Sequence, residues 1–226
     1  MHINEKRTSP FRSSRFFAKF RDFFNASIPL PAMSLQPLLD YVNRLVPLTE
    51  AEGSLFLSKF KTRKYLKGQY VVQQGDVCHY ESFVLSGCLK TFHVDPDGQE
   101  HVVMFAVENW WTSDLGSFLN HTPADYNVQC LEPTELALIS YPDLEALYGQ
   151  LPQAERFFRI ILQRALVAAQ KRIVQNFSLS ARERYLAFKK QYPQIEQRVP
   201  QYLVASYLGF TPEFLSKIRA QVAAGA

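Results

Sequence analysis

A group of polar side chains near the C-terminus has the types and spacing needed to contact the edges of DNA bases. Thr211 can cap a helix that has Pro212 at its first position. In the first turns of that helix, Glu213 can accept from a cytosine amino group and Lys217 can donate to guanine O6 and N7. Ser216 can contact a phosphate, which positions a protein without specifying sequence. The predicted DNA-binding residues are Gln201, Tyr202, Thr211, Glu213, Ser216, Lys217 and Arg219.

Two short helices joined by a glycine turn are predicted to hold these side chains. Val204 and Leu208 lie four residues apart on one helical face, and Gly209 stands where a left-handed residue ends a helix. Ala205 is small enough for a second helix to approach closely, and Leu215 would lock that helix in place. This is the spacing of a helix-turn-helix, whose second helix enters the major groove. An ordinary helical hairpin is the alternative.

A long helix without a breaker is predicted before this motif, from Pro152 to about Phe177. The apolar residues of this helix form a narrow stripe along one face. Such a stripe is typical of a coiled-coil seam, and a second copy of the chain is the simplest partner for it. Packing only against its own barrel is the alternative. The predicted seam consists of Phe158, Leu162, Ala165 and Ala169, at 4-3-4 spacing.

Short β-rich runs separated by turn residues fill the stretch between about residues 61 and 140. Such spacing favours an antiparallel barrel or sandwich rather than a parallel sheet with crossover helices. Capping boxes predict helix starts at Thr49 with Glu52 and at Ser180 with Glu183. The predicted strands are 70–73, 82–85, 89–93, 102–106, 127–131 and 136–140.

The charge of the 226-residue chain is unevenly distributed, although its net value is only +4. Residues 180–226 carry seven basic and three acidic side chains, which favours a polyanionic partner. Residues 1–33 carry six basic and two acidic side chains and are predicted to be a poorly ordered basic extension. Three cysteines without paired spacing indicate free thiols in a reducing cytoplasm, and no apolar run is long enough to span a membrane.

Four stretches of the sequence resemble the Crp–Fnr superfamily of bacterial regulators. They read YVVQQGD (70–76), FVLSGCLKTF (83–92), ENWWTSDLGSFL (108–119) and RVPQYLVASYLGFTPEFLSKIR (198–219). The resemblance implies an α+β fold with an N-terminal antiparallel β-roll or jelly-roll barrel, a long dimerisation helix and a C-terminal all-α helix-turn-helix domain. It also implies a homodimer on double-stranded DNA, with RNA polymerase and an unidentified small-molecule effector as further candidate partners. The expected divisions are 1–33 (extension), 34–150 (sensor), 151–178 (dimerisation helix) and 179–226 (DNA-binding domain).

The ligand cassette departs from the cyclic-nucleotide-binding members of this family. Ala124 and Asp125 stand where an Arg-Ser pair would bind the cyclic phosphate, Asp114 replaces a glutamate, and Ser113 replaces a glycine. Cyclic AMP is therefore not expected to bind. Two adjacent tryptophans can fill the pocket, pack on a strand, or stack on a more apolar ligand. The candidate pocket residues are Trp110, Trp111, Ser113, Asp114, Ala124 and Asp125.

No cofactor, catalytic residue or metal site is expected. No cysteine precedes Cys78, so the N-terminal cysteine cluster of the iron–sulfur branch is missing. The sequence has no P-loop, GxGxxG, GxSxG or HExxH motif, and no His-x-His pair for a cupin-like metal enzyme. Two alternatives stay open beside a DNA-binding regulator, a sensor or scaffold dimer without DNA binding and, less favoured, a cupin-like enzyme.

Overall fold

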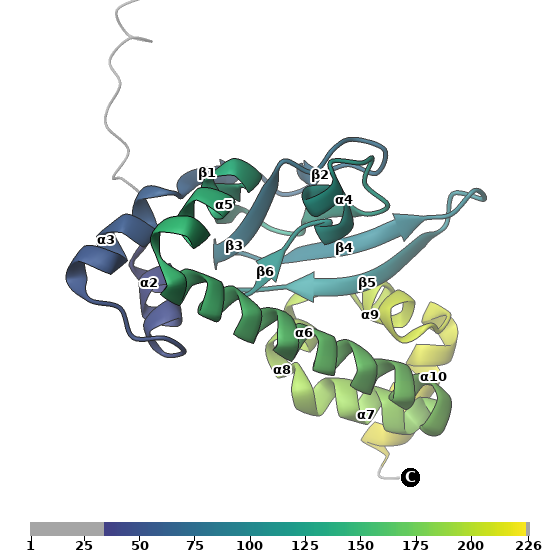
Figure 1. Cartoon of the computed structure of the whole chain (residues 1–226). Coiled ribbons are helices and arrows are strands. Elements are labelled where there is room, and N and C mark those ends of the chain that lie inside the picture. Colours follow the sequence, from purple (N-terminus) through teal and green to yellow (C-terminus); the bar gives the residue numbers. More distant parts are fainter. Residues whose placement is uncertain (1–33, 225–226) are drawn as a thin grey trace, which may run out of the picture. The chain divides into compact units, whose positions relative to one another are not determined.

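The computed structural model describes residues 34–224, so the predicted basic extension at 1–33 lies outside the described residues. Two four-stranded antiparallel sheets form the N-terminal half, in the strand orders β1-β8-β3-β6 and β2-β7-β4-β5 (Figure 1). Both sheets contribute to one hydrophobic core, which confirms the predicted barrel. The strands are β1 (Lys61–Tyr65), β2 (Tyr70–Val72), β3 (Tyr80–Ser86), β4 (Leu89–Val94), β5 (Glu100–Ala106), β6 (Trp111–Thr112), β7 (Asn127–Cys130) and β8 (Thr134–Ser140).

The turn between β3 and β4 depends on a glycine. Gly87 has φ +111°, a conformation that L side chains rarely adopt. A Cβ added there would lie 2.8 Å from the Cα of Thr134, so no larger residue fits without moving the backbone. The Gly87 N–H donates to Glu108 at 2.8 Å, which ties this turn to the segment after β5.

Helices precede and follow the strands along the sequence, and most of them begin at a residue whose side chain caps the helix. Both predicted capping boxes are confirmed, since the side chains of Thr49 and Ser180 accept from the backbone N–H of Glu52 and Glu183. The long helix ends at Ser178, within a residue of its predicted end. The helices are α2 (Gln36–Asn43), α3 (Glu50–Ser58), α4 (Leu115–Asn120), α5 (Tyr141–Gln150), α6 (Pro152–Ser178), α7 (Ala181–Gln191), α8 (Pro193–Arg198), α9 (Gln201–Leu208) and α10 (Pro212–Ala223).

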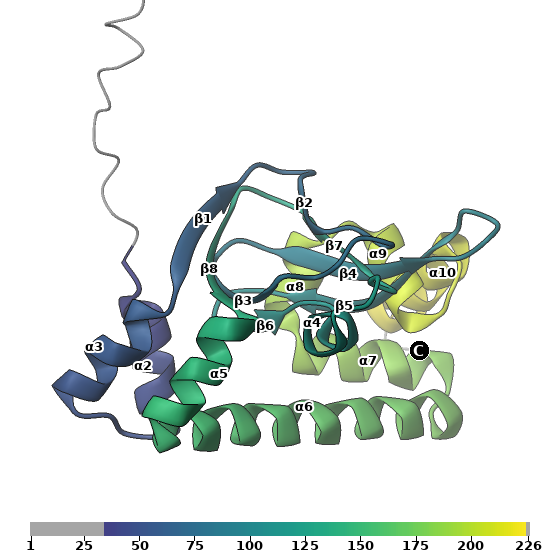
Figure 2. The same ribbon diagram turned by 45° about the horizontal axis from the view of Figure 1, so that its top comes forward.

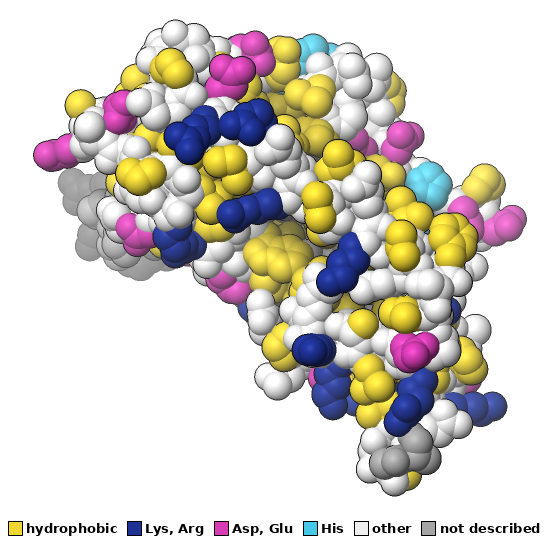
Figure 3. Space-filling view, turned by 60° about the horizontal axis from the view of Figure 1, so that its bottom comes forward, with side chains coloured by type: hydrophobic (Ala, Val, Ile, Leu, Met, Phe, Trp, Pro, Cys, Tyr) yellow, Lys and Arg dark blue, Asp and Glu magenta, His cyan; other side chains and the backbone are white. Residues whose placement is uncertain are grey.

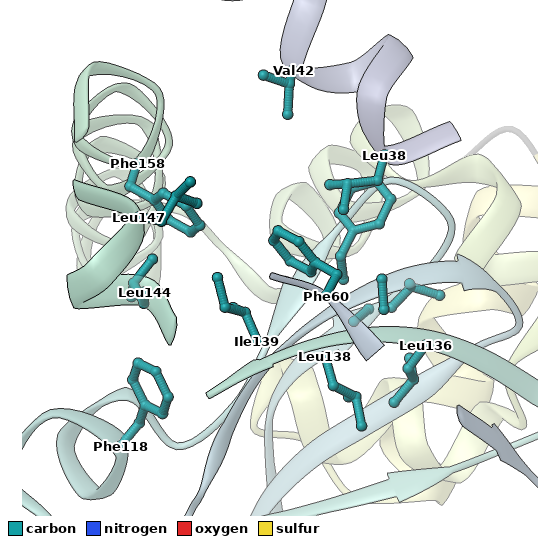
Figure 4. Close-up of a cluster of buried hydrophobic side chains, with 14 of the residues drawn as sticks. Leu38, Val42, Phe60, Phe118, Leu136, Leu138, Ile139, Leu144, Leu147 and Phe158 are labelled. Carbon is teal, nitrogen blue, oxygen red and sulfur yellow. The ribbon is translucent and has the colours of Figure 1, made fainter. Parts of the chain in front are cut away.

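The core of the β-roll also anchors the start of the long helix α6. Figure 4 shows Leu38 and Val42 of α2, Leu144 and Leu147 of α5 and Phe158 of α6 directed at the same interior. Phe158 is 5% exposed, and its ring lies 5.1 Å from that of Trp111. Phe158 therefore belongs to the core of its own chain rather than to an exposed seam, which corrects the first position of the predicted stripe.

Beyond this anchor, α6 is exposed on every side for almost three turns. All residues from 162 to 171 are exposed, including Leu166 at 61% and Val167 at 63%. Figure 2 shows α6 extended as a single straight element, with α7 returning alongside it. No helix in the described part of the chain is long and apolar enough to cross a membrane.

The C-terminal helices pack directly on the edge strand β5 of the second sheet. Buried residues of β4 and β5 share one hydrophobic cluster with those of α7, α8, α9 and α10. Four consecutive residues of β4, Leu89 to Phe92, are buried because the roll's core covers one face and this cluster the other. The edge strand is thereby covered by a helix, which prevents pairing with other chains.

Candidate functional site

The helix-turn-helix is held by local backbone geometry at its turn. Gly209 ends α9 in the left-handed conformation, with φ +72°, as predicted. The Phe210 N–H donates to the Ala205 carbonyl at 2.9 Å, and Thr211 Oγ1 accepts from the Phe214 N–H at 3.2 Å. Pro212 is the first residue of α10. Pro200 is the N-cap of α9.

Apolar side chains lock the two helices together on their inner faces. Val204 and Ala205 of α9 are fully buried, and Leu208 is 8% exposed. From α10, Leu215 and Ile218 are buried in the same cluster. A larger residue at Ala205 would push α10 away and change the angle at which its outer face is presented.

The outer face of α10 carries most of the predicted DNA-binding residues. Thr211, Glu213, Ser216 and Lys217 are all exposed, with no ion pair recorded for the two charged ones in the described residues. Tyr202, at the start of α9, is also exposed, at 58%. Donors and acceptors therefore line the N-terminal half of the second helix, where a major groove would be read.

Two predicted contacts are partly engaged within the protein instead. Arg219 Nη2 lies 3.8 Å from Glu196 Oε1 of α8. Gln201 Nε2 donates to the Glu196 carbonyl at 3.4 Å, while its Oε1 is buried without a partner in the described structure. The amide of Gln201 would have to leave this position to reach a nucleic acid, whereas Arg219 is exposed and its guanidinium has five N–H donors.

Two contacts that sequence reasoning missed attach this domain to the β-roll. The guanidinium of Arg198 donates to Glu108 at 2.7 and 3.0 Å and also pairs with Glu132. Although burial opposes it, hydrogen bonds from Arg198 and Gly87 hold the pKa of Glu108 below its ordinary value. Ser206 Oγ accepts from the Val102 N–H at 3.0 Å and donates to the Glu100 carbonyl at 2.9 Å. No local sequence signal marks these pairs, whose members lie 66 to 106 residues apart.

The predicted ligand cassette is closed by one of its own carboxylates. Asp114 is 3% exposed and accepts from the backbone N–H groups of Ser117, Asp125 and Tyr126 at 2.9, 2.7 and 3.0 Å. Asp114 therefore caps α4 and holds the following loop through the same side chain. Ala124 is buried, and the structure brings it to the same loop. The side chain of Asp125 is exposed at the surface.

The other candidate pocket residues, Trp110, Trp111 and Ser113, are associated with a separate cavity beside α6. Ser113 Oγ donates to Glu81 Oε1 at 2.8 Å, and burial raises the pKa of Glu81 to about 7. Glu81, Trp110 and Trp111 line a cavity of about 660 Å³ beside α6. Ser113, Asp114, Ala124 and Asp125 are not among the lining residues. The six predicted pocket residues thus divide between a closed cassette and an open cavity.

The tryptophans pack as well as line this cavity. Trp111 contacts the rings of Phe83, Phe157 and Phe158, with centroids 5.1 to 6.1 Å apart, so it is part of the aromatic core. Trp110 lies against Tyr192 of the C-terminal domain, at 5.6 Å.

Comparisons with known proteins agree with this architecture. Residues 62–150 match the family described as the cyclic nucleotide-binding domain. The chain is 28% identical over 169 residues, 69% of its length and 68% of its relative's, to the transcriptional activator protein Anr of Pseudomonas aeruginosa.

Solved structures share the fold at low sequence identity. The c-di-GMP-responsive global regulator CLP of Xanthomonas campestris superposes with a TM-score of 0.65, at 18% identity over 78% of this chain and 93% of that one. FixK2 of Bradyrhizobium japonicum gives a TM-score of 0.63, at 16% identity over 74% of this chain and 85% of that one. The chain is therefore similar to bacterial transcription regulators of the Crp–Fnr kind, with a cyclic nucleotide-binding domain match over 62–150 followed by a long helix and a helix-turn-helix.

Proposed function

We propose that the protein is a sequence-specific DNA-binding regulator that acts as a homodimer and does not respond to cyclic AMP. The observation that carries DNA binding is the outer face of α10, where Thr211, Glu213, Ser216 and Lys217 are exposed beside a well-packed turn. Exposed donors and acceptors on a recognition helix have base edges and phosphates as their natural partners.

The homodimer is supported by the exposed middle of α6. Apolar side chains are costly to leave in water, yet Leu166, Val167, Ile173 and Phe177 are between 56% and 87% exposed. Leu162, Ala165 and Ala169, the other predicted seam residues, are also exposed, and they line a cavity beside α6. The partner we infer is a second α6. Two identical helices can bury matching apolar stripes against each other, and this pairing relates two DNA-binding domains by a twofold axis.

The closed cassette supports the absence of a cyclic AMP response. The carboxylate of Asp114 already takes the N–H groups of Asp125 and Tyr126, which are then unavailable to a phosphate. The family's phosphate-binding arginine is replaced by Ala124, so this position supplies no cation to a phosphate. A cyclic phosphate would be repelled rather than bound.

The test is a salt titration on duplex DNA. The full chain would be measured on random and on selected duplexes, with and without a small-molecule extract of cells, so that an unidentified effector is supplied. We expect the Lys217→Ala variant to bind its selected site about tenfold more weakly and with a smaller salt slope. Lys190→Ala, on the exposed surface of α7, is the matched control and should change selected-site affinity much less. Equal binding to random and selected duplexes under both conditions would contradict the proposal and leave a sensor or scaffold dimer.

A further inference from the structure

The cavity beside α6 differs from the closed cassette in position and in chemistry. It extends along α6 from Phe158 to Asn176, which is about 27 Å of helix at about 1.5 Å per residue. Across from α6 its wall is formed by β5 and by helices α7 and α9 of the C-terminal domain. At about 660 Å³ it has the size of a site for a small organic molecule.

One part of the cavity is apolar and mostly aromatic. Trp110, Trp111, Phe118 and Phe158 line it near the β-roll, together with Met104 of β5. Trp111 Nε1 is buried and has no hydrogen-bond partner among the described residues. Such walls favour a flat or flexible hydrocarbon body over a sugar or a nucleotide.

The other part of the cavity is cationic. Arg164, Lys171, Arg172 and Arg184 line it, and Glu81 is its single acidic lining residue. Figure 3 shows the face that carries α6 and α7, where basic side chains stand among hydrophobic ones. An anionic group would be favoured at this end and disfavoured beside Glu81.

Two of these arginines are held close to each other without a carboxylate partner. Arg172 donates to the carbonyls of Val103 and Tyr207, and Arg184 Nη1 donates to the next carbonyl, of Leu208, at 3.1 Å. These bonds cap the last carbonyls of α9 and fix both guanidinium groups. No ion pair is recorded for either group within the described residues. A guanidinium has five N–H donors, so donors remain on both, and the buried Nε of Arg184 has no partner there.

We propose that this cavity binds an elongated anionic amphiphile, of which a long-chain carboxylate is the simplest, with its chain against the tryptophans and its anionic group beside Arg172 and Arg184. The ligand would contact the β-roll, α6 and the DNA-binding domain at once. It would therefore change how these three parts pack. That regulatory consequence rests on the proposed function, whereas the binding itself does not.

The test uses the intrinsic fluorescence of the full chain, whose two tryptophans both line the cavity. Dodecanoate would be titrated below its micelle concentration, beside dodecanol and dodecyltrimethylammonium as probes with the same chain and other headgroups. We expect a saturable change with dodecanoate at a concentration at least tenfold lower than with either of the other two. No saturable change with dodecanoate, or equal affinity for all three, would overturn the proposal.

Variants then locate the anionic group. The double change Arg172→Gln and Arg184→Gln should weaken dodecanoate binding about tenfold or more and change dodecanol binding less than twofold. Arg182→Gln, exposed on α7 outside the cavity, is the matched control and should bind as the unchanged chain does. Unchanged dodecanoate binding by a folded double variant would overturn the placement. If that variant does not fold, the headgroup comparison on the unchanged chain still decides.

The proposed dimer contact can use Leu166 and Phe177, which are exposed and do not line the cavity. A second copy that instead enters the cavity, against Leu162, Ala165 and Ala169, is the competing occupant. In that case tryptophan emission would change on dilution of the protein alone, and dodecanoate would have no effect, which would overturn the proposal. Because this experiment contains no DNA, a failure of DNA binding and a failure of amphiphile binding are separate results.

Discussion

At the scale of single residues, Asp114 is a buried carboxylate whose hydrogen bonds are all made within the protein's own backbone. Its carboxylate satisfies three backbone N–H groups from two segments, α4 and the loop at 125–126. A buried carboxylate is stable only when it is hydrogen-bonded in this way. The sequence predicted that the cassette had changed, but not that its own carboxylate would close it, because that depends on where two loops meet.

Removing this carboxylate should destabilise the fold. We expect Asp114→Ala to lower the free energy of unfolding by about 2–4 kcal/mol, because three N–H groups lose a charged acceptor in a buried place. Urea denaturation would measure it. Asp125→Ala, whose side chain is exposed, is the control and should cost much less. Similar stabilities for the two variants would show that Asp114 does not hold the loop.

The buried carboxyl of Glu81 should make stability depend on pH. Burial raises its pKa from an ordinary 4.5 to about 7, so the folded chain keeps a proton that the unfolded chain releases between these values. The favourable contribution of Glu81 to the free energy of unfolding is fully present below about pH 4.5, and it is lost as the pH rises through about 7.

Glu81→Gln cannot ionise and should escape this loss. Relative to the unchanged chain, its urea midpoint should rise between about pH 4.5 and pH 7 and level off above about pH 7. Glu145→Gln, which removes a carboxylate on the exposed surface of α5, is the control. A parallel pH dependence of the Glu81→Gln variant and the unchanged chain would contradict the raised pKa.

At the scale of elements, several helix boundaries followed from local chemistry, whereas β1, α4 and α8 did not. The capping boxes and Gly209 are short-range signals, and each lies where it was expected. Strand β1 was missed because Lys61–Tyr65 is exposed except at its last residue, so it lacks an apolar pattern. Helix α8 was missed because of the two effects of Pro193. A proline disfavours the helical conformation of the residue before it, which predicts the end of α7, but Pro193 is also the first residue of α8.

The exposed stripe of α6 should be the dimer contact. We expect Leu166→Glu to shift the protein from dimer to monomer in sedimentation velocity without loss of thermal stability in the monomer, because Leu166 is 61% exposed in a single chain. Gln170→Glu adds the same charge at an exposed polar position nearby and should leave more of the dimer. A dimer unaffected by Leu166→Glu would place the interface elsewhere.

The ion pairs of Arg198 should hold the C-terminal domain on the β-roll. The Val102 N–H reports this docking, since it donates to Ser206 of α9. We expect Arg198→Gln to speed hydrogen exchange at Val102 by about tenfold, which corresponds to about 1.4 kcal/mol. Exchange within β8, which pairs with β1 and β3, should not change. An unchanged rate at Val102 would show that Arg198 is not needed for docking.

At the scale of the whole molecule, the order of parts was predictable and their contacts were not. Periodicity and turn residues predicted an antiparallel barrel or sandwich, a long helix and two helices at helix-turn-helix spacing, and the family resemblance favoured the barrel. The packing of α9 on β5 depends on Ser206, Arg198 and a shared apolar cluster that only the folded chain brings together. The cavity beside α6 could not be foreseen for the same reason, since its walls come from distant segments.

The central claim, a dimer that reads DNA through α10, is tested most directly by selecting binding sites from random duplexes and footprinting the full chain on them. We predict two inverted half-sites with centres about one helical turn, roughly 34 Å, apart, and loss of the footprint with Lys217→Ala. Protection of a single half-site, or a footprint that survives Lys217→Ala at full affinity, would contradict this account.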